Sequence, residues 1–147
     1  IANDRITRIL SRVKANNIIV VADSCYSGTV FRGLGISNLT NEPKAEVFRR
    51  LIEKKTRVAL TSGGNEPVPD QVGSSSHSVF ANSFIKILRD NVTVLTASRL
   101  ASRLKERVIA VTKSYNITQT PEYSSIYKAD HDGGDFLFVP GQLVRSN

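Results

Sequence analysis

The sequence has one cysteine and no methionine, and it contains no long hydrophobic run. A single cysteine cannot form a disulfide within the chain, which favours a reducing, cytoplasmic setting. No apolar segment approaches the ~20 residues that a membrane-spanning helix needs, so we expect no membrane partner. Because the chain begins at Ile1 and lacks methionine, we expect that an upstream part of the parent protein has been removed.

Residue clusters that would bind metal are also missing from the sequence. There is no Cys/His spacing of the zinc-binding kind and no EF-hand-like run of acids, so we expect neither a metal nor another cofactor. The net charge is +7, from 20 Lys and Arg against 13 Asp and Glu, but the basic residues are spread over several predicted helices. No aromatic residues interleave with them as in single-strand binders, which disfavours a nucleic-acid partner.

The 147 residues suit one globular domain or a large part of one. Apolar residues at helical spacing predict helices around Ile6–Val13, Val47–Ile52, Ser78–Leu88 and Ala97–Val108, the last with Thr96 as its cap. A continuous apolar run predicts a strand at Ile18–Ala22, which we expect to be buried on both faces. Turn residues bound two further predicted strands, Arg57–Thr61 and Asp135–Val139. The alternation predicts an α/β fold with a mainly parallel sheet covered by helices.

The cysteine lies where the first predicted strand ends. Cys25 follows Asp23 and Ser24, which are the first polar residues after "IIVVA", and Gly28 comes three residues later. Ligands gather beyond the carboxyl ends of parallel strands, so Cys25 and Ser62 both fall at the edge where a site is expected. Free cysteines are often simply buried, and the residues alone leave a nucleophile and a structural thiol equally open.

The segment "VVADSCYSG" resembles the cysteine motif of caspase-like peptidases, in particular the metacaspase and bacterial caspase-like (orthocaspase-type) branch. "RVALTSGGNEPVPD", "HSVFANSFIKIL" and "GGDFLFVP" resemble, in the same order, the segments that follow in bacterial members. Tyr26 departs from the histidine that is usual in metacaspases, at a position that is not the catalytic base. The resemblance implies a caspase-like three-layer α/β/α sandwich, of which residues 1–147 would form the carboxy-terminal two-thirds of the peptidase domain.

This resemblance implies a Cys–His dyad in which histidine assists formation of the Cys25 thiolate. In caspases the histidine lies ~50 residues before the cysteine, and only 24 residues precede Cys25 here. We therefore expect the catalytic histidine on an upstream fragment of the same protein, which would be a partner of this chain. For His77 we expect a structural or capping role at a helix start, and for His131 a solvent-facing position in a turn.

By the same resemblance, Asp23 would line the primary specificity pocket and pair with Arg or Lys of a protein or peptide substrate. The backbone near Ser62, at the end of the second predicted strand, would line the same pocket. Glu66 and Asp70 would either add negative charge to this pocket or, as we slightly favour, only keep a loop soluble. Arg32–Gly33 is the expected site of internal processing. No acid closely follows Cys25, so the residues do not indicate calcium dependence.

Two functions from different classes follow from these expectations. The first is a thiol endopeptidase (a hydrolase) that cleaves after Arg or Lys. The second is a catalytically inactive caspase-fold module that serves in interaction or regulation. A His-Gly pair in the segment upstream of Ile1 would favour the enzyme, and its absence would favour the module.

Overall fold

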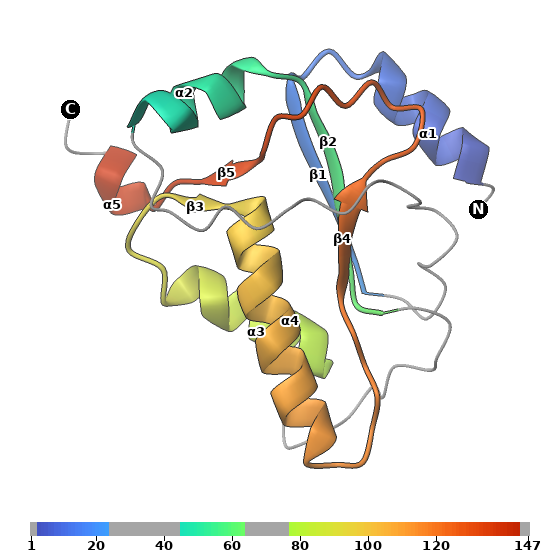
Figure 1. Cartoon of the computed structure of the whole chain (residues 1–147), viewed down its shortest axis with the longest axis vertical. Helices are drawn as coiled ribbons and strands as arrows, with labels where there is room; N and C mark the ends of the chain where they lie inside the picture. The colour runs from blue at the N-terminus through green and yellow to red at the C-terminus, as the bar shows by residue number, and fades with distance from the viewer. Residues whose placement is uncertain (1–2, 24–44, 64–76, 145–147) are drawn as a thin grey trace.

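The computed structural model describes residues 3–23, 45–63 and 77–144 (Figure 1). The helices in these ranges are α1 (Asn3–Arg12), α2 (Ala45–Glu53), α3 (Val79–Arg89), α4 (Ala97–Lys113) and α5 (Gly141–Val144). The strands are β1 (Asn17–Ala22), β2 (Thr56–Thr61), β3 (Leu95–Thr96), β4 (Glu122–Ser125) and β5 (Leu137–Phe138). None of the helices described is long and apolar enough to span a membrane.

The starts of α3 and α4 follow from local capping. Ser78 Oγ accepts a hydrogen bond from the Ala81 backbone N–H at 2.9 Å, and Thr96 Oγ1 accepts one from the Arg99 N–H at 3.3 Å. Each hydroxyl satisfies an amide that has no partner within its helix. The prediction of Thr96 as a helix cap is confirmed.

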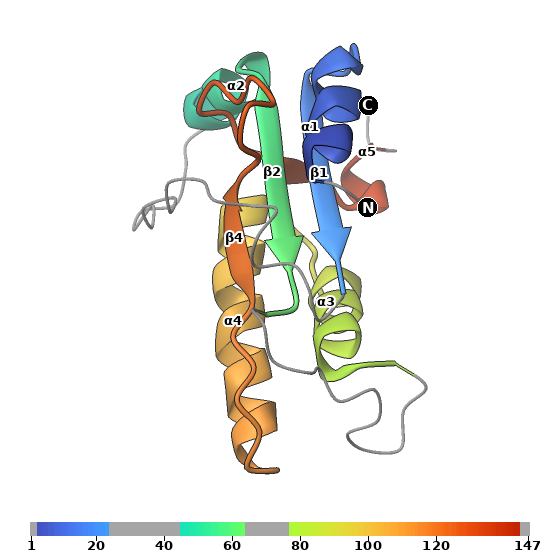
Figure 2. The same cartoon turned by 90° about the vertical axis from the view of Figure 1, so that its right-hand side faces the viewer.

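The main sheet has the order β1-β2-β4. β1 and β2 are parallel, with Asn17 opposite Thr56 and Ala22 opposite Thr61. β4 runs antiparallel to β2, so the sheet is mixed rather than mainly parallel. Figure 2 shows the three strands side by side, with the arrowheads of β1 and β2 pointing the same way. The sequence of β4, "EYSS", gave no strand signal because it lacks an apolar run.

The third predicted strand differs from the expectation. Only Leu137 and Phe138 of the predicted segment form a strand, and this strand (β5) pairs antiparallel with β3, apart from the main sheet. Asp135 lies before this strand, and its side chain accepts a hydrogen bond from the Phe136 N–H at 2.8 Å.

Burial of the two parallel strands also corrects the sequence reading. Every residue of β2 is buried, whereas β1 is only half-buried, with Val21 40% exposed. The difference has a simple cause. In the described part of the chain β2 lies between two strands, but β1 pairs with β2 alone. A central strand loses solvent contact on both sides, and an edge strand does not.

Helices cover both faces of the main sheet. Figure 1 shows the sheet nearly edge-on, with α1 on one side and α3 and α4 on the other. On the α3/α4 side, Leu60 and Ile19 join a core built around Phe80, Leu100 and Leu104. On the α1 side, Ala59 and Val20 pack with Leu10 and Ile126 in a smaller cluster. Alternate residues of each strand thus face opposite layers, as the pleat requires.

Candidate functional site

The candidate site lies at the carboxyl ends of β1 and β2. Ser62 directly follows β2 and is fully buried, and its backbone N–H donates to the Ala22 carbonyl at 3.1 Å. This bond continues the parallel ladder one residue beyond β2 and holds the two strand ends together. Ser62 and Asp23 are therefore neighbours at this edge, where the strand ends predicted Ser62 to lie.

Asp23 is exposed and is linked to the start of α3. Its Oδ2 atom accepts a hydrogen bond from Ser78 Oγ. Because Ser78 Oγ also accepts from the Ala81 N–H, one hydroxyl connects the end of β1 to the first turn of α3. No second hydrogen-bond partner of Asp23 is found in the part of the chain that the structure describes. A carboxylate has about four acceptor positions, so Asp23 retains capacity for a further cationic or N–H donor.

Ser78 is the member of this edge that sequence reasoning missed. The signal was present, because a serine directly before an apolar helical stripe is a preferred N-cap. What the sequence did not give is the partner of that serine, which lies 55 residues earlier in the chain.

Several predicted site features fall outside the described residues. These are the nucleophile candidate Cys25, the processing site Arg32–Gly33, and the loop acids Glu66 and Asp70. The described part of the site therefore consists of Asp23, Ser62 and Ser78, and Asp23 precedes Cys25 by two residues in the sequence.

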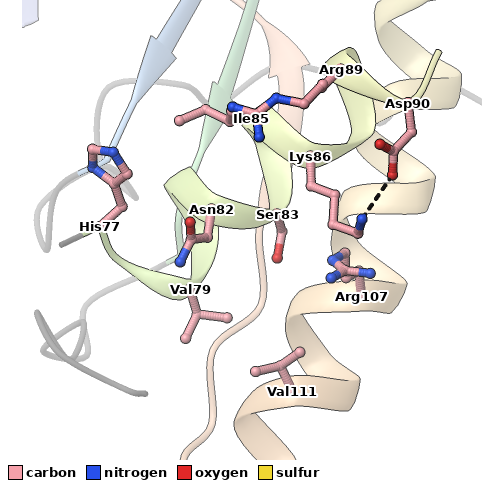
Figure 3. Close-up of a pocket in the computed structure, with 10 residues that line it drawn as sticks. All are labelled: His77, Val79, Asn82, Ser83, Ile85, Lys86, Arg89, Asp90, Arg107 and Val111. Atoms are coloured by element: carbon pink, nitrogen blue, oxygen red, sulfur yellow. Dashed lines mark ion pairs between the residues drawn. The ribbon is translucent and has the colours of Figure 1, made fainter. Parts of the chain in front are cut away.

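The two histidines lie at different ends of the main sheet. His77 is exposed and precedes Ser78, so the residue that caps α3 is Ser78 and not His77. Figure 3 shows His77 at the amino end of α3. His131 Nδ1 accepts a hydrogen bond from the Arg57 N–H at 3.2 Å, near the start of β2. Thr61 lies four positions after Arg57 in β2, so the two residues are about 13 Å apart along the strand. His131 therefore lies away from the Asp23 edge.

His131 is not the solvent-facing turn residue that the sequence predicted. It is half-buried, and burial lowers its pKa against the smaller raising effect of Asp135 and Asp132. The neutral ring suits the contact with Arg57, since Nδ1 can accept a hydrogen bond only when it carries no proton. This role is structural.

The segment before β5 is organised around a buried carboxylate. Asp135 is 4% exposed and accepts hydrogen bonds from Tyr123 Oη (2.9 Å) and from Ser98 Oγ (2.5 Å). It thereby joins β4 to the first turn of α4. Desolvation by burial raises the pKa of Tyr123 above its ordinary value, and the neighbouring Asp135 carboxylate, which accepts a hydrogen bond from the Tyr123 hydroxyl, raises it further. The motif "GGDFLFVP" therefore has a packing role in this structure.

Metal binding has no support in the part of the chain that is described, where no three His, Cys, Asp or Glu side chains come together. The Asp23 edge instead offers one exposed carboxylate beside a buried serine and the start of a helix.

No family model, curated protein or solved structure matches this chain.

Proposed function

We propose that this chain carries the nucleophile of a caspase-like cysteine endopeptidase that cleaves after Arg or Lys. In this proposal the Cys25 thiolate attacks the scissile carbonyl carbon and forms an acyl-enzyme. A histidine from an upstream segment takes the thiol proton and returns it to the leaving amine, and water then hydrolyses the acyl-enzyme. The described elements would belong to an α/β/α sandwich.

The observation that carries the proposal is the place of Asp23. Its carboxylate lies at the carboxyl edge of a parallel strand pair, two residues before Cys25, and is exposed. Ser78 holds one of its oxygens, which fixes the side chain without neutralising its charge. A guanidinium that reached the remaining acceptor positions would form a charge-assisted pair, as expected for a pocket that selects Arg.

The pairing of β1 supports the requirement for an upstream segment. In the described part of the chain, the edge of β1 that faces away from β2 has no paired strand. An added strand at that edge would end beside Asp23 if it ran parallel to β1. A histidine at the end of such a strand would lie close to Asp23, which precedes Cys25 by two residues in the sequence.

The test uses the parent protein with its upstream segment and peptide reporters that end in Arg, Lys or Asp. We expect cleavage after Arg and Lys that is lost in Cys25→Ala and retained in His77→Ala. Loss of activity in His77→Ala would contradict an upstream base, and a preference for Asp would contradict the role of Asp23. Absence of cleavage from all reporters would favour an inactive interaction module.

A pair of matched variants separates charge from structure at the pocket. Asp23→Asn keeps an oxygen for Ser78 but loses the negative charge, so we expect kcat/KM for Arg reporters to fall by about 10²-fold. Ser78→Ala keeps the charge and loses the contact, and we expect a smaller loss. If Ser78→Ala were the more damaging of the two, Asp23 would act in the structure and not on the substrate.

A further inference from the structure

A basic groove runs between α3 and α4. Two adjoining cavities form it, each with a volume of about 370 Å³. Lys86, Asp90 and Arg107 line both cavities, while Arg89 belongs to the first and Arg103 to the second. Four cations therefore surround one carboxylate. We call this surface the α3/α4 groove.

The positive charge of the groove is only partly compensated. Lys86 Nζ pairs with Asp90 at 3.0 Å, and both side chains are more than half exposed. Figure 3 shows Lys86 and Arg107 pointing toward one another across the gap between the helices. Arg103 and Arg107 are four residues apart and share one face of α4. Lys86 and Arg107 bring two positive charges into the groove beside the single acid Asp90, and this excess of positive charge favours an anionic ligand.

The apolar lining indicates which kind of anion fits. Val79, Ile85 and Val111 line the first cavity and Val92, which is 66% exposed, lines the second. The lining thus combines aliphatic side chains with cations, which suits a peptide that contains both acidic and aliphatic residues. Neither cavity has a Phe, Tyr or Trp residue in its lining, which disfavours a site for stacked nucleobases.

The groove begins at the candidate active-site edge. His77 lines its first cavity, and the next residue, Ser78, binds Asp23. The groove then follows α3, whose 11 residues extend about 16 Å. An extended peptide covers that length with about five residues.

We propose that the α3/α4 groove binds an acidic, aliphatic segment of the substrate that lies within about five residues of the basic residue at the cleavage site. The proposal rests on the endopeptidase function for its biological meaning. Binding of the acidic peptide requires only the groove, so binding and cleavage can be tested separately.

The binding arm uses a fluorescent peptide of alternating Glu and Leu, without Arg or Lys, and measures anisotropy with the parent protein. We expect saturable binding that weakens about tenfold in the double variant Arg103→Gln/Arg107→Gln, as expected for the loss of two partly exposed ion pairs. The matched control is Lys105→Gln/Lys113→Gln, which makes the same charge change on exposed residues of α4 outside both cavities. We expect the control to bind like the wild type, and far-UV circular dichroism checks that each variant is folded. If the Arg double variant does not fold, Arg107→Gln alone replaces it.

Three results would overturn the proposal: no binding of the acidic peptide, equal weakening in both double variants, or equally tight binding of a single-stranded oligonucleotide of the same charge. The first excludes the site, and the other two reduce it to general charge attraction.

The cleavage arm compares Arg reporters with and without an acidic extension. We expect the extension to raise kcat/KM in the wild type and to raise it less in Arg103→Gln/Arg107→Gln. If the extension leaves kcat/KM unchanged while the acidic peptide still binds, the groove does not contribute to the choice of substrate. If no reporter is cleaved but the peptide binds, the endopeptidase function fails and the groove remains a peptide-binding site.

Discussion

Replacement of Asp135 by Ala should destabilise the fold more than any other single loss of an acid in the described part of the chain. The carboxylate is 4% exposed and accepts four hydrogen bonds, from Tyr123 Oη, Ser98 Oγ, the Ser98 N–H and the Phe136 N–H. Two of these donors are side-chain hydroxyls that would lose a charged acceptor. Counting only the bonds from these two hydroxyls, at about 1.5–3 kcal/mol for each charge-assisted bond, we expect a loss of about 4 kcal/mol in the free energy of unfolding. Such a loss is a large part of the about 5–15 kcal/mol that holds a typical domain.

The position of Asp135 explains why the loss should be cooperative. Its two oxygens connect β4, through Tyr123, with the first turn of α4, through Ser98. Tyr123→Phe removes one donor and leaves the other three bonds, so we expect it to cost about 1.5 kcal/mol. In the double variant the two losses should not add, and the coupling free energy should be about 1 kcal/mol or more.

The assay is urea unfolding followed by far-UV circular dichroism, because the chain has no tryptophan to report by fluorescence. An unchanged m-value would show that the variants alter stability and not the extent of unfolding. The matched control is Asp132→Ala, which removes an exposed acid three residues earlier and should change stability by less than about 0.5 kcal/mol. A loss below about 1 kcal/mol in Asp135→Ala, or zero coupling with Tyr123→Phe, would refute the reasoning.

Three further predictions concern the same region. Because burial beside Asp135 raises the pKa of Tyr123 above 10, only the unfolded chain ionises this residue just above that pH. Stability should then fall with rising pH by up to about 1.4 kcal/mol per unit, and Tyr123→Phe should flatten this slope in urea titrations. Burial lowers the pKa of His131 below 6.5, so the unfolded chain binds its proton first and stability should fall as the pH drops below 6.5. His131→Gln should reduce this loss of stability at low pH. An unchanged dependence of the free energy of unfolding on pH would contradict a buried neutral imidazole at His131. Finally, Gly134→Ala should cost about 3 kcal/mol by overpacking, since its Cβ would lie 2.6 Å from the Lys54 carbonyl oxygen. Gly141→Ala meets no atom within 4 Å and should leave the thermal midpoint nearly unchanged.

Local patterns predicted the elements well where the signal is local. The apolar stripe from Val79 to Leu88 and the cap at Thr96 depend on neighbours in the chain, and the structure has α3 and α4 there. The same holds for β2, which was predicted at Arg57–Thr61 and is the central strand of the main sheet. The strand ends also brought Asp23 and Ser62 to one edge, since a parallel pair aligns its carboxyl ends.

Errors arose where pairing over long distances decides the outcome. β4 is short and polar, and it is a strand because the edge of β2 offers it hydrogen bonds. β1 (NIIVVA) is more apolar than β2 (TRVALT) and yet half-exposed, because it pairs with one strand in the described part of the chain and β2 pairs with two. His131 was predicted to face solvent in a turn, but in the structure its ring accepts a hydrogen bond from the Arg57 N–H, 74 residues away in the chain.

By itself the sequence determined the α/β alternation, the Thr96 cap of α4 and the polar cluster that ends the first parallel strand. These features follow from side-chain periodicity and backbone hydrogen bonding within a few residues. Only the tertiary structure decided that Ser78 holds Asp23, that Asp135 joins β4 to α4, and that cations of α3 and α4 face a common groove. Each of these depends on side chains that are distant in the chain and become neighbours only when helices pack on the sheet.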